Sequence, residues 1–230
     1  MKITVIGASG LIGAKVVELL TAEGHEVVAA ARNTGIDVLT GKGLDEALTA
    51  SAALVDVTNS PSFEDGPVLE FFTKATTNVV AAARNAGVGQ YVVLSIVGVD
   101  GLPRSGYMRA KVAQEKLLTE SGLPYTIVRA TQFAEFTDAI TGSMTAGDEV
   151  RVPDALIQPI AADQVASEVA RAAVSGPVND VVNIGGPHKI SFEQMARESL
   201  GRQGDETKTV IVDPDATYFG TPLQRDSLVT

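Results

Sequence analysis

A glycine-rich turn near the N-terminus constrains the fold more than any other feature of this sequence. The apolar run Ile3 to Ile6 leads into three glycines spaced G-x-x-G-x-x-G, at Gly7, Gly10 and Gly13, and the pattern of an amphipathic helix follows at once. Glycines carry no Cβ to block an approaching pyrophosphate, and a helix start offers free N–H groups and the positive end of its dipole. Strand, turn and helix together predict a dinucleotide site; a glycine-rich turn without a ligand is the alternative.

The composition narrows the class of protein. The 230 residues suit one α/β domain, and the absence of cysteine excludes disulfides and thiolate chemistry and fits a reducing compartment. A net charge of -10 disfavours binding to nucleic acid, which depends on neutralising phosphates. No apolar run approaches the roughly 20 residues of a membrane span, and residues 1–6 read as a strand rather than a signal peptide. We therefore expect a cytoplasmic protein with a small-molecule substrate and neither a nucleic-acid nor a membrane partner.

Short β-branched runs alternate with helical patterns along the chain, which predicts a Rossmann-type, doubly wound parallel sheet. The expected strands are residues 2–6, 26–31, 36–38, 54–57, 91–95, 125–129 and 181–184. A helix over 67–86 should lie buried against the sheet, and only a short loop fits between Arg32 and a helix at 43–50. Past residue 130 the alternation loosens. Residues 1–230 are therefore expected to form a single domain in which 131–230 contribute a small substrate-side lobe.

Three local signals are predicted within that lobe. Asp163 should cap a helix that extends to Val174. Ser191 to Gln194 form a capping-box pattern that begins a second helix, which is expected to end at Gly201. A strand is expected over residues 207–212.

The residue that follows the second strand indicates which dinucleotide is bound. An NAD-binding fold usually places an Asp or Glu there for the ribose 2′-hydroxyl, but this strand runs into Arg32, Asn33 and Thr34. An arginine can pair with a 2′-phosphate through a bidentate, charge-assisted contact. The sequence therefore favours NADP(H) over NAD(H), and a solvated surface arginine is the alternative.

A second group of residues points to proton transfer. Tyr107 and Lys111 are four residues apart at the start of a predicted helix, so their side chains share one face. A nearby ammonium favours the phenolate and should lower the tyrosine pKa, as a general acid or base requires. Ser95 ends a predicted strand, where ligands of open parallel sheets bind. A purely structural Y-x-x-x-K is the alternative.

Taken together, these motifs resemble the short-chain dehydrogenase/reductase superfamily, and more narrowly its atypical, NmrA-like or NAD(P)H-binding members. The resemblance covers roughly residues 1–200. It rests on the glycine turn, on Arg32, on Ser95, on Tyr107 with Lys111, and on two longer stretches, which are residues 81–88 and 122–129. It implies a Rossmann fold, a nicotinamide cofactor and oxidoreductase chemistry. It also suggests the helices near 67–86 and 107–121 as the face of a homodimer.

The resemblance implies a role for each matching position. Gly7, Ser9, Gly10, Leu11, Ile12 and Gly13 would hold the pyrophosphate, and Arg32 the 2′-phosphate. Asp37 and Val38 would lie beside the adenine, Thr58 and Asn59 beside the adenosine ribose, and Ala130, Thr131, Gln132 and Phe133 along the nicotinamide. Ser95, Tyr107 and Lys111 would form the catalytic group, with Lys111 also reaching the nicotinamide ribose. No metal is implied, because His25 and His188 fall in separate predicted turns.

Three departures from the family pattern bear on catalysis. Phe72 stands where the family often has an asparagine, which breaks the proton relay or leaves it to water. The interval from Ser95 to Tyr107 is short, and Ala130 replaces a frequent proline. The sequence therefore favours an NADPH-dependent oxidoreductase acting on a carbonyl or quinone-like acceptor. A non-catalytic cofactor sensor, and an epimerase or dehydratase with retained cofactor, remain as alternatives.

Overall fold

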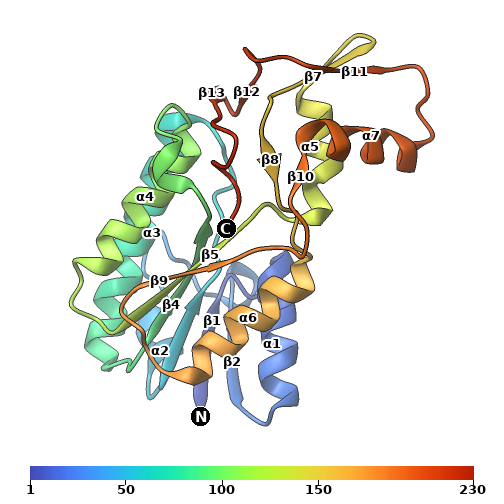
Figure 1. Cartoon of the computed structure of the whole chain (residues 1–230). Coiled ribbons are helices and arrows are strands. Elements are labelled where there is room, and N and C mark those ends of the chain that lie inside the picture. Colours follow the sequence, from blue (N-terminus) through green and yellow to red (C-terminus); the bar gives the residue numbers. More distant parts are fainter.

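The computed structural model describes all residues, 1–230, and is built around a six-stranded parallel sheet (Figure 1). The strand order is β2-β1-β3-β4-β5-β9, which confirms the doubly wound Rossmann-type sheet. The strands are β1 (Lys2–Ile6), β2 (Glu26–Ala30), β3 (Ala53–Asp56), β4 (Tyr91–Ile96), β5 (Tyr125–Ala130) and β9 (Val181–Ile184). Strand β2 is added on one side of β1, and β3 and the later strands are added on the other side. Sheets of this kind open a ligand crevice at such a switch point, at the carboxyl ends of the strands.

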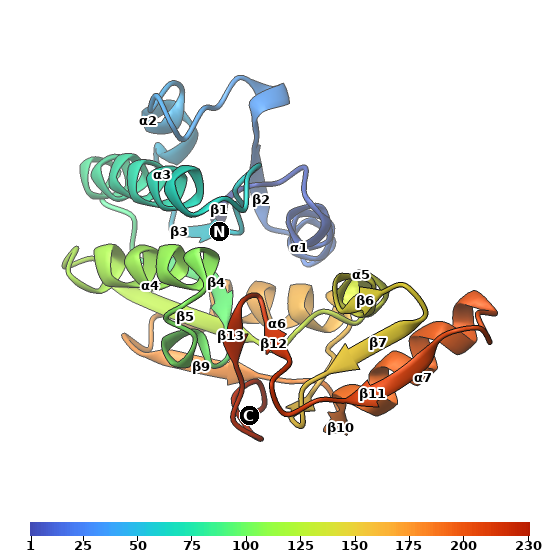
Figure 2. The ribbon, with the colours of Figure 1, turned by 90° about the horizontal axis from the view of Figure 1, so that it is seen from above.

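Helices cover both faces of the sheet because its strands are apolar on both sides. The helices α1 (Leu11–Ala22) and α6 (Ala162–Ser175) pack on one face. The helices α2 (Leu44–Leu48), α3 (Asp65–Ala86) and α4 (Gly106–Thr119) pack on the other, and Figure 2 shows α3 and α4 side by side. Successive residues of a strand point to opposite faces, so Val92 joins the first of these two cores while Tyr91 and Val93 join the second. None of the helices has the length and apolar character that crossing a bilayer requires.

The strand predicted at residues 36–38 does not form. After β2 the chain makes a 3-10 turn, η1 (Arg32–Thr34), and then a loop in which the carboxylate of Asp37 accepts the backbone N–H of Leu39 at 2.8 Å. The side-chain amide of Asn78 on α3 donates to the carbonyls of Val38 at 2.9 Å and Leu39 at 3.0 Å. These local contacts satisfy backbone groups that a sheet would otherwise pair, and β2 is left as the edge strand.

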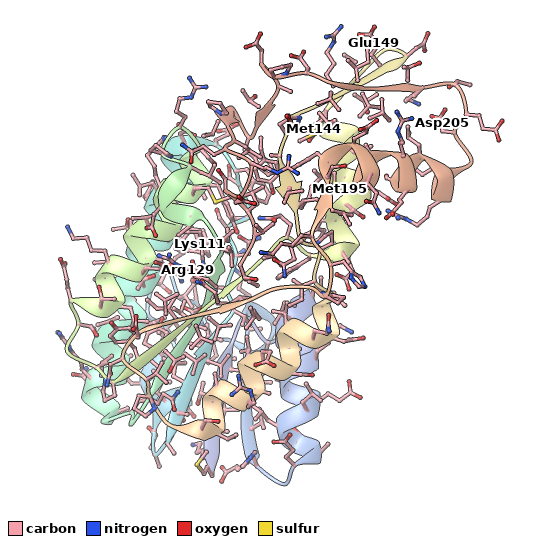
Figure 3. All side chains as sticks on the ribbon, viewed as in Figure 1. Lys111, Arg129, Met144, Glu149, Met195 and Asp205 are labelled. Atoms are coloured by element: carbon pink, nitrogen blue, oxygen red, sulfur yellow. The ribbon has the colours of Figure 1, made fainter.

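The C-terminal lobe extends from the upper end of the sheet (Figure 1). It contains η3 (Ala134–Phe136), α5 (Thr137–Ser143), β6 (Thr145–Ala146), β7 (Glu149–Val152), β8 (Leu156–Ile157), β10 (Ile190–Ser191), α7 (Phe192–Gln203), β11 (Thr209–Val212), β12 (Thr217–Tyr218) and β13 (Thr221–Pro222). Figure 3 shows Met144 and Met195 in this lobe, away from Lys111 and Arg129 in the sheet layer. Residues 131–230 are not all lobe, however, because α6 and β9 complete the sheet layer between lobe segments.

Two predicted helix boundaries past residue 130 are wrong. Ala161, not Asp163, is the N-cap of α6; the carboxylate of Glu135 accepts the Ala162 N–H at 2.9 Å, and Asp163 instead pairs with Lys15 at 2.6 Å. Helix α7 does begin with Ser191 accepting the Gln194 N–H at 3.0 Å, but it continues past Gly201. It ends at Gly204, whose left-handed backbone makes it the better helix stop.

Candidate functional site

A cleft of about 930 Å³ opens at the carboxyl ends of β1, β3, β4 and β5, beneath the C-terminal lobe. Its volume falls in the upper part of the range of about 300 to 1,000 Å³ that is usual for ligand pockets. Sixteen of the predicted site residues line it, and these are Gly7, Ser9, Gly10, Leu11, Ile12, Arg32, Val38, Thr58, Asn59, Ser95, Tyr107, Lys111, Ala130, Thr131, Gln132 and Phe133. Gly13 and Asp37 are not among the lining residues.

The three glycines of the first turn do different things. Gly7 has φ +83° and lies against the end of β3, where an added Cβ would sit 2.9 Å from the carbonyl oxygen of Val57. Gly10 is the N-cap of α1, with no side chain capping the helix start. A Cβ on Gly13 would lie 2.1 Å from the Gly7 oxygen, so this glycine allows α1 to pack against the turn. The result is an uncapped helix N-terminus facing the cleft, a geometry suited to phosphate.

The edge of the cleft beside β2 carries an arginine with no partner. Arg32 is exposed, lines the cleft and forms no ion pair or hydrogen bond through its side chain. Asp37 turns away into the loop, where its hydrogen bond to the Leu39 N–H lowers the pKa of its carboxyl group. Ile36 and Val38 line this end of the cleft instead. An apolar slot beside a free guanidinium is suited to a flat base next to an anion.

Tyr107 is held at the floor of the cleft by one hydrogen bond and two rings. Its hydroxyl donates to Oδ1 of Asn59 at 3.0 Å, and its ring centre lies 5.3 Å from that of Phe63 and 6.0 Å from that of Phe72. Burial raises the pKa of Tyr107 to about 12. The prediction that Lys111 would lower this pKa is therefore wrong, because loss of hydration outweighs any attraction to the ammonium group.

Lys111 is buried beneath the tyrosine. Its Nζ donates to the carbonyl oxygen of Leu94 at 2.8 Å and to Oε1 of Gln114, and it lies 4.7 Å from the centre of the Phe72 ring. Burial lowers the pKa of Lys111 to about 8, although the carboxylates of Asp56 and Glu115 act in the opposite direction. Phe72 thus places an aromatic ring against both members of the Tyr–Lys pair, at the position where the family often has asparagine.

A polar network behind Lys111 was missed in the sequence. Asp56, at the end of β3, is buried; its Oδ2 accepts the hydroxyl of Tyr91 at 2.7 Å and the amide of Gln114 at 3.3 Å. Its Oδ1 accepts the hydroxyl of Thr58 at 2.7 Å. The network fixes Gln114, which in turn holds Lys111. The sequence signal for it was a carboxylate inside an apolar strand, because such a group is buried only with partners.

Two buried polar side chains at the cleft have no partner in the protein. The Oγ of Ser95 is unpaired, and so are both the amide nitrogen and the amide oxygen of Gln132. Ser95 lies near the end of β4 and Gln132 follows β5, so both lie where strand ends meet the cleft. Buried polar groups are nearly always hydrogen-bonded, so unpaired ones lining a cleft are candidates for contact with water or a ligand. Together with the glycine turn and Arg32, these residues fit a dinucleotide with its nicotinamide end near Ser95.

The C-terminal hairpin supplies a wall that the sequence did not predict. Tyr218 and Phe219, from β12 and its turn, line the cleft together with Phe136 and Ile140 of the lobe. No motif marks these residues, and they approach Tyr107 only because the last segment of the chain folds back over the sheet. The cleft can therefore hold an extended cofactor along the strand ends and a second molecule under the lobe.

Comparison with known proteins agrees with this arrangement. A family model described as NAD(P)H-binding matches residues 35–175. The chloroplastic divinyl chlorophyllide a 8-vinyl-reductase of Cucumis sativus is 30% identical over an alignment of 257 residues, gaps included. The alignment covers 96% of this chain and 59% of that protein. The photosystem II assembly factor Ycf39 of Cyanophora paradoxa is 29% identical over 147 residues, 58% of this chain and 46% of that protein. The chain spans about half the length of these relatives.

Solved structures show the same fold at low sequence identity. The UDP-glucose 4-epimerase of Thermus thermophilus, in complex with NAD, matches with a TM-score of 0.73 and 19% identity over 100% of this chain and 90% of that one. A nucleoside-diphosphate-sugar epimerase from Staphylococcus aureus matches with a TM-score of 0.75 and 17% identity, over 94% and 81% of the two chains. The match to the family model extends over more than half of the sequence, and the chain therefore belongs to the NAD(P)H-binding family.

Proposed function

We propose that this protein is an NADP(H)-dependent oxidoreductase that reduces a carbonyl or quinone-like acceptor. The observation that carries the proposal is one cleft in which the uncapped start of α1, the free Arg32, the unpaired Ser95 and the Tyr107–Lys111 pair all meet. When bound, the reduced nicotinamide supplies the hydride. The residues of this chain orient the acceptor and manage the proton.

Tyr107 is the proton donor in this proposal, and its environment favours reduction over oxidation. With a pKa of about 12, the hydroxyl is protonated at neutral pH, so it can donate a proton to an oxygen that gains negative charge. The reverse reaction needs the phenolate, which burial disfavours. Ser95 lies near the end of β4 and lines the cleft, and its unpaired, buried Oγ would donate to the same acceptor oxygen once the side chain turns toward the cleft. Lys111 lies beneath Tyr107 and would bind the nicotinamide ribose.

Arg32 supports NADP(H) as the cofactor. It stands just after the end of β2 in place of a carboxylate, and its guanidinium is free of ion pairs. A dianionic 2′-phosphate would be the natural partner for it, whereas NADH offers only hydroxyls. The glycine turn would hold the pyrophosphate, Ile36 and Val38 would contact the adenine, and Gln132 would contact the nicotinamide amide.

A cofactor sensor without catalysis is the second candidate, and Phe72 favours it. A buried phenyl ring stands against Lys111, so no side chain there passes a proton onward from the Tyr–Lys pair. One relative is named as an assembly factor rather than an enzyme, while another is named as a reductase. Turnover decides between these two candidates. An epimerase or dehydratase would keep its cofactor and consume no NADPH in net terms.

The test is NADPH oxidation by the purified chain, followed by the absorbance of the reduced nicotinamide, with a panel of aromatic aldehydes, diketones and quinones. Tyr107→Phe should lower turnover by at least about 100-fold and leave the Kd for NADPH unchanged by calorimetry. Tyr125→Phe is the matched control, because Tyr125 begins β5 at the opposite end of the strand from the cleft. Tight NADPH binding with no turnover on any acceptor would favour the sensor. Failure to bind NADPH would refute both candidates.

A further inference from the structure

The hydroxyl of Tyr218 is the least expected polar group in the cleft. The residue is only 5% exposed, yet its hydroxyl forms no hydrogen bond in the protein. It is not among the polar atoms sealed from solvent, so its oxygen reaches the open space of the cleft that Tyr218 lines. Buried tyrosines almost always find a partner for this group. The Tyr218 hydroxyl is open to the cleft, so a ligand bound there can take the place of water as its partner.

The ring of Tyr218 is fixed by its neighbours, so its hydroxyl has a defined direction. The ring centre lies 5.8 Å from that of Phe192 at an interplanar angle of 64°, and 4.6 Å from that of Phe219 at 76°. Burial raises the pKa of Tyr218, and the nearby Tyr107 adds to this shift. Two tyrosines thus line one cleft, one from α4 and the other from the C-terminal hairpin.

The turn that carries these residues is strained. Strands β12 and β13 pair Tyr218 with Thr221, which leaves Phe219 and Gly220 as a two-residue turn with φ +46° and +73°. Both central residues at positive φ is the pattern of a type I′ turn, where Asn-Gly is strongly preferred and a bulky residue costs energy. The phenyl ring at this position is 57% exposed and lines the cleft. The turn thus places an exposed aromatic ring at the cleft.

Aromatic rings also gather around the mouth of the cleft. Phe63 is 62% exposed and Phe136 is 50% exposed, and both line the cleft together with Phe219. Large apolar side chains left in solvent around a pocket mark a surface that a ligand covers. Three rings of this kind fit a flat aromatic body better than a sugar or another hydrated substrate.

We propose that Tyr218 is a substrate-binding residue whose hydroxyl donates to a second oxygen of the acceptor, so that the substrate is a flat aromatic dicarbonyl compound. This inference rests on the proposed function, because Tyr107 and Ser95 serve the oxygen that is reduced. One carbonyl takes a hydride at carbon from the reduced cofactor and a proton at oxygen from Tyr107, which regains its proton from solvent. The other carbonyl keeps its hydrogen bond, and Tyr218 transfers nothing.

The test compares two flat tricyclic sulfonates, one with two carbonyl oxygens and one with none. Anthraquinone-2-sulfonate and anthracene-2-sulfonate are titrated by calorimetry into the full chain saturated with NADP⁺, which permits no reduction. The wild type should bind the quinone more tightly, and Tyr218→Phe should remove about three- to tenfold of that preference, the effect of one hydrogen bond. Phenylalanine keeps the packing on Phe192 and Phe219. Tyr125→Phe should keep the full preference.

The outcomes separate this inference from the proposed function. Equal affinity of the wild type for both probes, or an unchanged preference in Tyr218→Phe, would overturn the role of Tyr218. NADP⁺ binding would then still stand. Absence of NADP⁺ binding would instead refute the proposed function. With 9,10-phenanthrenequinone as the substrate, Tyr218→Phe should raise KM several-fold with little change in kcat, whereas Tyr107→Phe should lower kcat.

Discussion

The ammonium nitrogen of Lys111 lies 4.7 Å from the centre of the Phe72 ring, in a part of the protein from which water is excluded. The ring face offers the cation some electrostatic stabilisation but no hydrogen bond. Only the Leu94 carbonyl and Gln114 accept from Lys111 directly. Burial in these surroundings is why the pKa of Lys111 is about 8 rather than its ordinary 10.5. The lysine therefore changes charge close to physiological pH.

The first prediction concerns stability against pH. Because the pKa of Lys111 is lower in the folded chain, the unfolded chain binds more protons between pH 8 and 10.5. The penalty for burying the charge is fully present below pH 8 and disappears as pH rises toward 10.5. The unfolding free energy of the wild type relative to Lys111→Met should therefore rise by up to about 3 kcal/mol across this window. Urea denaturation at about pH 7.5, 9 and 10 measures it; a constant difference would contradict the burial argument.

The second prediction concerns cofactor choice. Arg32→Met keeps the apolar stem of the side chain and removes the guanidinium, so the Kd for NADPH should rise about 10- to 100-fold while that for NADH stays within about twofold. Calorimetric titration of both cofactors gives the two values. Arg197→Met is the control, since Arg197 pairs with Glu193 on α7 in the lobe. If the Kd values for NADPH and NADH rise equally, Arg32 does not bind the 2′-phosphate.

The third prediction separates two glycines that look alike in the sequence. Gly13→Ala places a Cβ 2.1 Å from the Gly7 oxygen and 2.8 Å from Ala8 Cα, both backbone atoms, so the fold should lose about 3 kcal/mol or more. Gly10→Ala meets only the Gly7 oxygen at 3.3 Å and should cost about 1 kcal/mol. It should still weaken NADPH binding, because the new methyl group lies at the helix start. Urea denaturation and calorimetry on both variants test this, and equal stability losses would contradict it.

The fourth prediction concerns the strained turn. Phe219→Asn supplies the residue that a type I′ turn prefers, so the chain should become more stable by up to about 1 kcal/mol. The same change removes the ring from the cleft and should weaken binding of anthraquinone-2-sulfonate. Denaturation and titration of one variant measure both effects. A loss of stability would mean that packing of Phe219 on Tyr218 outweighs the strain of the turn.

The strands and most helices were predictable because their signals are local. The run ending at Gly7 and the helix ending at Gly87 carry periodicity and stop signals within a few residues. The segment at 36–38 has a β-branched pattern too, but Asp37 caps its own loop and Asn78 supplies distant hydrogen bonds. The edge of β2 stays open to pairing, so these hydrogen bonds from outside the local pattern, and not a lack of a partner strand, override the strand propensity of the segment.

Residue patterns alone predict the sheet, the glycine turn and the position of Arg32, Ser95, Tyr107 and Lys111 near the carboxyl ends of the strands. These features follow from residue spacing, because the spacing along one strand or helix sets which side chains lie on the same face. The electrostatics and the outer wall of the cleft follow instead from the packing of distant segments. The pKa of Tyr107 rises because surrounding elements exclude water, and Tyr218 reaches the cleft only after more than one hundred intervening residues have folded. Burial and contacts between distant segments depend on how the layers pack, which no local pattern encodes.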